Sequence, residues 1–194
     1  MTLILASASS IRRALLAAAG VEVVVDPAMV DEAAVKANHG GDDAALAVGL
    51  AQAKALDVSS GGSLNWVIGG DSVVSVAGVR FDKPASREQA AEHLRFFSGK
   101  TMRLTSAVAL ARGGEIKWSH SGEAKLAVRV LSEDFIQAYL TMEWPDVSYC
   151  VGVFRMEGRG ATLFDKIDGD HFTILGLPLL PLLAALRARG LMAS

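Results

Sequence analysis

The sequence contains very little cysteine, and this scarcity sets the first limits on the protein. Cys150 is the single cysteine among 194 residues, which excludes an intramolecular disulfide framework and suits a reducing cytoplasm. It lies in an apolar run, residues 147–151, where we expect a small buried hydrophobe and not a nucleophile. We therefore predict a cytoplasmic protein without a catalytic thiol.

Long apolar runs are also missing, although 51% of the residues are hydrophobic. No run reaches membrane-spanning length, and residues 1–6 are too short for a signal-peptide core and lack a basic lead. The net charge of −2 argues against a general nucleic-acid coat. We expect one soluble domain covering residues 1–194, with no membrane or nucleic-acid partner.

Several familiar site motifs do not occur. The chain has no Walker phosphate loop, no dinucleotide-binding glycine motif after the first strand, and no nucleophile elbow. Acids at 165–170 lack the alternation of a calcium loop. The four histidines show no metal-ligand spacing: His39, His93, His120 and His171.

A carboxylate does stand in the middle of an apolar strand, residues 67–74. If buried, Asp71 needs a cation, a metal or several hydrogen-bond donors, because desolvating a lone charge is costly. Gly69 and Gly70 leave room for another group, such as a ligand, near the backbone. Asp71 is then either a residue that caps a turn or a catalytic carboxylate.

A possible phosphate cradle follows the first strand. Residues 2–6 predict a buried strand, and a helix with a serine N-cap follows it and ends at Gly20. Arg12 and Arg13 oppose the dipole in its first turn, and a bound anion would remove this conflict. Forked guanidinium donors at a helix start suit a phosphate. The alternative is that both arginines are solvated.

Other charged residues are candidates for the same site. Residues 42–56 predict a helix with Lys54 on or beside its apolar face, so Lys54 either extends to solvent or points into a site. Pro84 holds Lys83 in an extended backbone. Asp31 and Glu32 lie in a loop, where they are either solvated or help to hold a divalent cation.

The remaining pattern predicts alternating strands and helices. Strands are expected at 21–25, 101–111 and 115–130, with a hairpin turn at residues 113–114 and another at Gly78. Helices are expected at 86–97 and 132–142, each with a serine N-cap, and at the C-terminus as far as Arg189, packed on the core.

Taken in order, the motifs resemble the Maf family of nucleoside triphosphate pyrophosphatases. The matching stretches span nearly the whole chain: residues 3–13, 30–32, 51–55, 67–71, 83–84, 98–101, 157–158 and 176–179. The resemblance implies an α/β, two-lobed Maf/ITPase-like fold with a long mixed β-sheet flanked by helices and a central cleft. It also implies a homodimer, a divalent cation (Mg²⁺ or Mn²⁺), and hydrolysis of a nucleoside triphosphate to monophosphate and pyrophosphate.

The resemblance assigns roles by position. Asp71 matches the general base of the family, and Asp71 and Glu32 match the acids near its metal. Its phosphate-binding residues are matched by Ser7, Arg12, Lys54 and Lys83. Arg13 is a further candidate, because it belongs to the possible phosphate cradle described above. An Asp beside a metal and lysines stays ionised and orients or deprotonates a water, while the cations offset charge on the phosphoryl oxygens.

Three positions bear on the choice of base: Ile11, Ser72 and Glu157. The family branch that acts on dTTP and UTP usually has Thr where Ser72 stands and Gln where Glu157 stands. Glu157 resembles instead the branch that prefers 7-methyl-GTP. That branch, however, tends to have an aromatic residue where Ile11 stands and Gln where Ser72 stands. A buried Glu157 could accept hydrogen bonds from a guanine edge, which favours a modified or non-canonical nucleotide.

The sequence leaves a second hypothesis open. The family resemblance also suggests a link to septum formation and cell division, so the alternative is a nucleotide-binding regulator without significant turnover. Asp71 favours the enzyme, because a pure binder gains little from an unpaired carboxylate facing phosphates.

Overall fold

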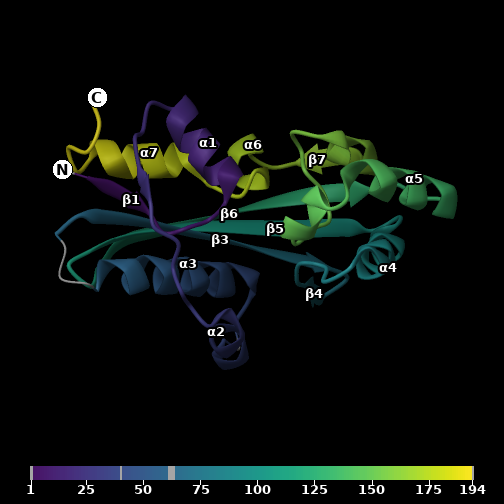
Figure 1. Ribbon diagram of the computed structural model, residues 1–194, viewed down its shortest axis with the longest axis horizontal. Helices are drawn as coiled ribbons and strands as arrows, with labels where there is room; N and C mark the ends of the chain where they lie inside the picture. The colour runs from purple at the N-terminus through teal and green to yellow at the C-terminus, as the bar shows by residue number, and fades with distance from the viewer. Residues whose placement is uncertain (1, 40, 61–63, 194) are drawn as a thin grey trace. The chain divides into compact units, whose positions relative to one another are not determined.

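The structure is a computed structural model that describes residues 2–39, 41–60 and 64–193. Strands and helices are interspersed along the chain (Figure 1). In order they are β1 (Leu3–Leu5), α1 (Ser10–Ala18), β2 (Val24–Val25), α2 (Glu32–Asn38), α3 (Asp43–Ser59), β3 (Trp66–Val76), β4 (Val79–Phe81), α4 (Arg87–Phe97), β5 (Thr101–Arg112), β6 (Glu115–Val128), α5 (Glu133–Glu143), the 3-10 helices η1 (Asp146–Tyr149) and η2 (Arg159–Leu163), β7 (Phe164–Asp168), α6 (His171–Ile174) and α7 (Leu179–Arg187).

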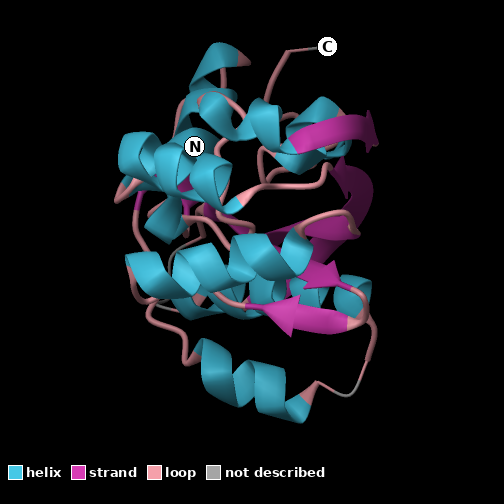
Figure 2. Ribbon diagram, turned by 90° about the vertical axis from the view of Figure 1, so that its right-hand side faces the viewer, coloured by secondary structure: helices cyan, strands magenta, loops and turns pink. Residues whose placement is uncertain are grey.

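The strands form a seven-stranded mixed sheet in the order β2-β1-β3-β5-β6-β7, with β4 paired to β3. Strand β1 is parallel to both β2 and β3, whereas the β3–β4 and β6–β7 pairs are antiparallel. Helices lie on both sides of the strands (Figure 2). The predicted α/β fold with a mixed sheet flanked by helices is therefore confirmed.

The chain divides into two compact units. The first comprises residues 1–72, 105–122 and 170–194, and the second comprises residues 73–104 and 123–169. Strands β3, β5 and β6 contribute residues to both. The cleft between two lobes, expected from the family resemblance, stays a prediction.

A hydrophobic core holds the first unit together. Large apolar side chains from β1, β3 and β5 meet those from α1 and α7, and most are fully buried: Leu3, Leu5, Leu16, Val21, Trp66, Ile68, Val108, Leu110, Leu177, Leu179, Leu182, Ala185 and Leu186. The predicted packing of the C-terminal helix on the core is confirmed. In the ranges that the structure describes, no helix is both long and apolar enough to cross a membrane.

Local sequence signals predicted many boundaries correctly. The side chains of Ser9, Ser86 and Ser132 accept hydrogen bonds from backbone N–H groups in the first turns of α1, α4 and α5. Gly113 and Gly114 both have positive φ, 58° and 75°, as a tight hairpin turn between twisted strands requires. The predicted serine caps and the β5–β6 hairpin are confirmed.

Two local predictions were wrong, and one strand was missed. Asp31 and Glu32 do not lie in a loop: Asp31 caps α2 by accepting a hydrogen bond from the Ala34 N–H, and Glu32 is the first helical residue. The strand expected at 21–25 is reduced to Val24 and Val25, because pairing with β1 covers only those residues. Strand β7 was not predicted, since its charged sequence forms a strand through pairing with β6.

Candidate functional site

Asp71 belongs to a charged cluster in the first unit that is centred on Lys54. Its Oδ1 lies 2.6 Å from Lys54 Nζ, and the same nitrogen lies 2.7 Å from Glu32 Oε1. The Lys54 and Asp71 side chains are only 14% and 13% exposed, whereas Glu32 is 42% exposed. Lys54 therefore does not extend to solvent but points toward Asp71 and Glu32.

Gly69 explains why helix α3 comes close enough for this contact. A Cβ at residue 69 would lie 2.1 Å from the Ala51 carbonyl oxygen and 2.7 Å from the Ala55 nitrogen, both in the backbone of α3. A Cβ at Gly70 would lie 3.3 Å from Arg12 Nε. The expectation that these glycines leave room for another group near the backbone is confirmed, and the groups are the α3 backbone at Gly69 and the Arg12 side chain at Gly70.

Arg12 is a buried cation near the same cluster. Its side chain is 9% exposed, and its guanidinium donates from Nε to the Gly176 carbonyl (2.8 Å), from Nη1 to Ser7 Oγ (3.1 Å), and from Nη2 to Ser72 Oγ (3.2 Å). All three acceptors are neutral oxygens. Burial lowers the pKa of Arg12, while the charges of Asp71 and Glu32 act in the opposite direction.

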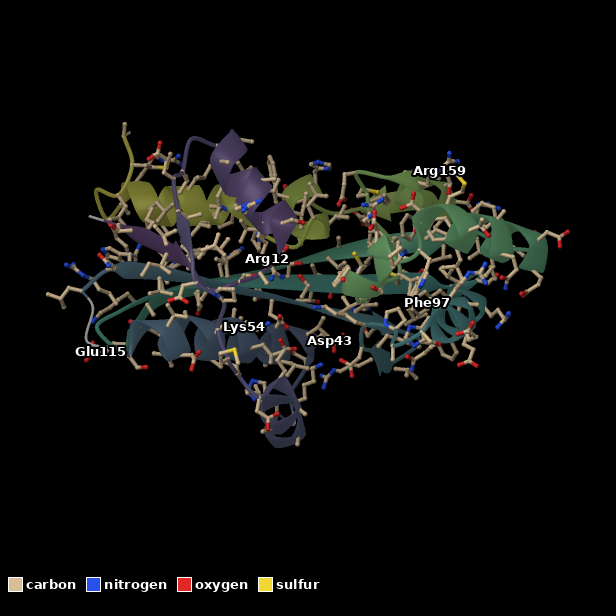
Figure 3. All side chains as sticks on the ribbon, viewed as in Figure 1. Arg12, Asp43, Lys54, Phe97, Glu115 and Arg159 are labelled. Carbon is tan, nitrogen blue, oxygen red and sulfur yellow. The ribbon has the colours of Figure 1, made fainter. Side chains whose placement is uncertain are left out.

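Helix α1 and helix α3 thus supply the two cations. Figure 3 shows Arg12 on α1 and Lys54 on α3, on opposite sides of β3. The Ser9 cap begins α1 so that Arg12 turns inward, whereas the next residue, Arg13, is exposed. The alternative in which both arginines are solvated therefore holds for Arg13 but not for Arg12, which is buried.

A serine that sequence reasoning missed lies beside this group. Ser72 Oγ is 2.9 Å from Ser106 Oγ on β5, and Ser106 in turn donates to the Thr173 carbonyl at 2.8 Å. Ser106 is completely buried. A lone serine in an apolar strand carries little sequence signal, and only the pairing of β3 with β5 reveals its contact.

Two other predicted residues belong to the second unit. Lys83 follows β4, and Glu157 lies in the loop before η2; both side chains are exposed. Both charges act on the Cys150 thiol, so these residues lie in one neighbourhood. The structure therefore brings one group of predicted residues together in each unit: Ser7, Arg12, Glu32, Lys54 and Asp71 in the first, and Lys83 and Glu157 in the second.

The expected burial of Glu157 was wrong. The buried carboxylate of this region is Glu143, 5% exposed, which accepts hydrogen bonds from Arg155 Nη2 (3.2 Å) and from the Arg159 N–H (3.3 Å). Glu143 thus accepts hydrogen bonds from this loop, whereas Glu157 lies at the surface. Ile11, the third predicted specificity residue, is half-buried on α1.

Cys150 is half-buried, and burial raises the pKa of its thiol to about 11, with Glu157 adding to the effect. Because the thiolate is the reactive form, we expect iodoacetamide at pH 8 to modify the folded protein at least about tenfold more slowly than the chain unfolded in guanidinium. Mass spectrometry of the labelled protein measures both rates. Equal rates would contradict the expected role as an unreactive hydrophobe.

The second unit also contains a hollow of about 550 Å³, lined by Ser75, Ala77, Gly78, Lys100, Thr101, Arg103 and Lys125. Glu123 lies 3.3 Å from Arg103 Nη1 and 3.9 Å from Lys125 Nζ. Lys100 Nζ lies over the Phe96 ring, 4.2 Å from its centroid. Glu123 therefore offsets part of the positive charge that Lys100, Arg103 and Lys125 bring to the hollow.

The donor set near Asp71 is suited to a divalent cation shared with a substrate. Within the described ranges, no group of three or more His, Cys, Asp or Glu side chains could hold a metal ion by itself. Glu32 and Asp71 nevertheless converge on one nitrogen, Lys54 Nζ. Mg²⁺ is often held by one or two carboxylates together with substrate phosphates and water, so two carboxylates fit such an ion.

Comparison with known proteins identifies the family of the chain. Residues 2–189 match the family described as Maf-like protein. A 7-methyl-GTP pyrophosphatase of Rhizobium etli is 46% identical over 97% of this chain and 96% of its own length, and a nucleoside triphosphate pyrophosphatase of Nitrobacter hamburgensis is 46% identical over 98% and 95%. The solved Ham1 protein of Staphylococcus aureus covers 97% of this chain and 100% of its own, with 14% identity and a TM-score of 0.44. The chain belongs to the Maf family.

Proposed function

We propose that the protein is a nucleoside triphosphate pyrophosphatase that hydrolyses modified or non-canonical nucleotides to a monophosphate and pyrophosphate. The observation that carries this proposal is the cluster in which Lys54 contacts Asp71 and Glu32 beside the buried Arg12. Family membership and the names of the relatives support it.

The cluster contains the groups that this reaction needs. Water attacks the α-phosphorus, the α–β bond breaks, and pyrophosphate leaves; Asp71 accepts the proton of the attacking water. Within the described residues, two of the three N–H donors of Lys54 contact carboxylates, and three of the five N–H donors of Arg12 are used. The remaining donors are available to phosphoryl oxygens, where they offset developing negative charge.

We also propose that Glu32 and Asp71 hold a divalent cation, Mg²⁺ or Mn²⁺. When bound, this ion supplies charge stabilisation at the phosphoryl oxygens. The residues of the chain contribute the carboxylates and keep them together through Lys54.

The substrate is expected among modified or non-canonical nucleotides, because one group of relatives is named for 7-methyl-GTP. The contacts of Ser72 favour a role at the phosphates, since its hydroxyl faces Arg12. Ile11 and Glu157 remain the proposed specificity residues. No observation favours a regulator without turnover, and the homodimer and the cytoplasmic location stay predictions.

A nucleotide panel tests the proposal. Purified protein with Mg²⁺ or Mn²⁺ is incubated with 7-methyl-GTP, dTTP, UTP, GTP and deaminated purine triphosphates, and monophosphate, pyrophosphate and orthophosphate are measured separately. We expect equal amounts of monophosphate and pyrophosphate, and none without the divalent ion. Release of orthophosphate alone, or tight binding without any hydrolysis, would overturn the proposal.

Gly69→Ala should lower both stability and hydrolysis. The new Cβ would meet the α3 backbone at 2.1 Å, so α3 must move and Lys54 moves with it. We expect a loss of about 1–3 kcal/mol in the free energy of unfolding in urea, together with slower pyrophosphate release. Gly20→Ala is the control: its φ of +73° makes alanine strained, but no atom lies within 4 Å of the new Cβ, so hydrolysis should persist. Full activity of Gly69→Ala would contradict the role given to α3.

A further inference from the structure

A chain of hydrogen bonds runs from Arg12 into the interior of the first unit. Arg12 Nη2 donates to Ser72 Oγ at 3.2 Å, and Ser72 Oγ lies 2.9 Å from Ser106 Oγ. Ser106 Oγ lies 2.8 Å from the Thr173 carbonyl oxygen at α6. The chain therefore links α1, β3, β5 and α6.

The direction of every bond in this chain follows from its two ends. The Thr173 carbonyl only accepts, so the single O–H of Ser106 is used there. Ser106 can then only accept from Ser72, which uses the single O–H of Ser72. The guanidinium only donates, so Ser72 accepts from Arg12 and has no proton left to donate elsewhere.

The same segment of chain holds Arg12 by a second route. Arg12 Nε donates directly to the Gly176 carbonyl at 2.8 Å, three residues after Thr173. Gly176 has a φ of +93°, and a Cβ there would lie 3.4 Å from Ser72 Oγ and 3.6 Å from Arg12 Nη2. Residues 173–176 thus fix both the Nε edge and the Nη2 edge of the guanidinium.

We propose that Ser106 is a positioning residue for Arg12: through Ser72 it orients the guanidinium so that its two unused N–H groups face a phosphate. This inference rests on the proposed function, in which Arg12 binds the triphosphate. Ser106 itself is completely buried and touches no substrate. Without Ser106, the Ser72 hydroxyl is free to rotate, and Arg12 loses a fixed acceptor for Nη2.

The test uses Ser106→Ala and inorganic tripolyphosphate as a probe that needs no hydrolysis. Calorimetry should show a Kd raised about three- to tenfold, as expected for a weakened hydrogen bond to a charged group. With a hydrolysed nucleotide, KM should rise by a similar factor while kcat changes by less than about twofold. An unchanged Kd in a folded Ser106→Ala protein would overturn the proposal.

Ser59→Ala is the matched control. Ser59 is 1% exposed and accepts a hydrogen bond from the Gly114 N–H at 3.0 Å, outside the contacts of Arg12. It should lose stability to a similar degree and keep the wild-type Kd for tripolyphosphate. An equal loss of affinity in Ser59→Ala would assign the effect to general stability and overturn the positioning role.

A double-mutant cycle separates positioning from packing. Because Ser106 acts through Ser72, the Ser72→Ala/Ser106→Ala protein should bind tripolyphosphate within about twofold of Ser72→Ala alone. Fully additive losses would mean that Ser106 acts independently and would overturn the chain. If the wild-type protein binds tripolyphosphate but hydrolyses no nucleotide, the proposed function fails while the positioning of Arg12 is still tested by Kd.

Discussion

Asp71→Asn is expected to lower kcat by about 10²–10⁴-fold while nucleotide affinity stays close to that of the wild type. The amide has the shape of the carboxylate but cannot accept a proton from the attacking water. Lys54 keeps its contact with Glu32, so the cation and its position are retained. The loss should therefore appear in the chemical step and not in binding.

Single-turnover release of pyrophosphate measures that step, and calorimetry with a non-hydrolysable triphosphate measures affinity. Asp165→Asn, at an exposed position on β7, is the matched control and should behave as the wild type. If Asp71→Asn hydrolyses nucleotides at the wild-type rate, Asp71 is not the general base.

Lys54→Met should lower kcat/KM by about 10²–10³-fold, the usual effect of removing one group that stabilises transition-state charge. Methionine keeps most of the length of the side chain but removes the charge that Asp71 and Glu32 share. The two carboxylates then lie close together without their common cation, and a triphosphate must approach both.

The measurement is the full rate dependence on nucleotide concentration, with unfolding in urea measured in parallel. Lys166→Met replaces an exposed lysine of β7 and should leave both quantities near the wild-type values. A Lys54→Met enzyme with kcat/KM within about threefold of the wild type would show that Lys54 is only structural.

Predictions that depend on local chemistry were the most successful. The serines before α1, α4 and α5 were recognised as caps because their hydroxyls accept N–H groups only three residues away. The β5–β6 hairpin was recognised because two adjacent glycines allow positive φ. Such signals need no knowledge of the rest of the chain.

Predictions that depend on distant contacts were incomplete or wrong. The two alternatives for Lys54 could not be separated until α3 was placed against Gly69. Glu157 was considered as a buried carboxylate, but it is exposed, and the buried carboxylate of its region is Glu143. The contact of Ser106 with Ser72 joins two strands that are distant in sequence. In each case the deciding neighbour lies far along the chain, where local pattern carries no information about distance.

The sequence by itself determined the element pattern, the residues of the charged cluster and the resemblance to the Maf family, because motif order and local hydrogen-bonding chemistry are written in neighbouring residues. Only the tertiary structure decided which arginine of the first helix turns inward, that Lys54 joins Asp71 to Glu32, and that Ser106 supports Arg12. The physical reason is that burial and hydrogen-bond partners depend on packing between elements, as at Gly69, where only the lack of a Cβ lets the α3 backbone lie against β3.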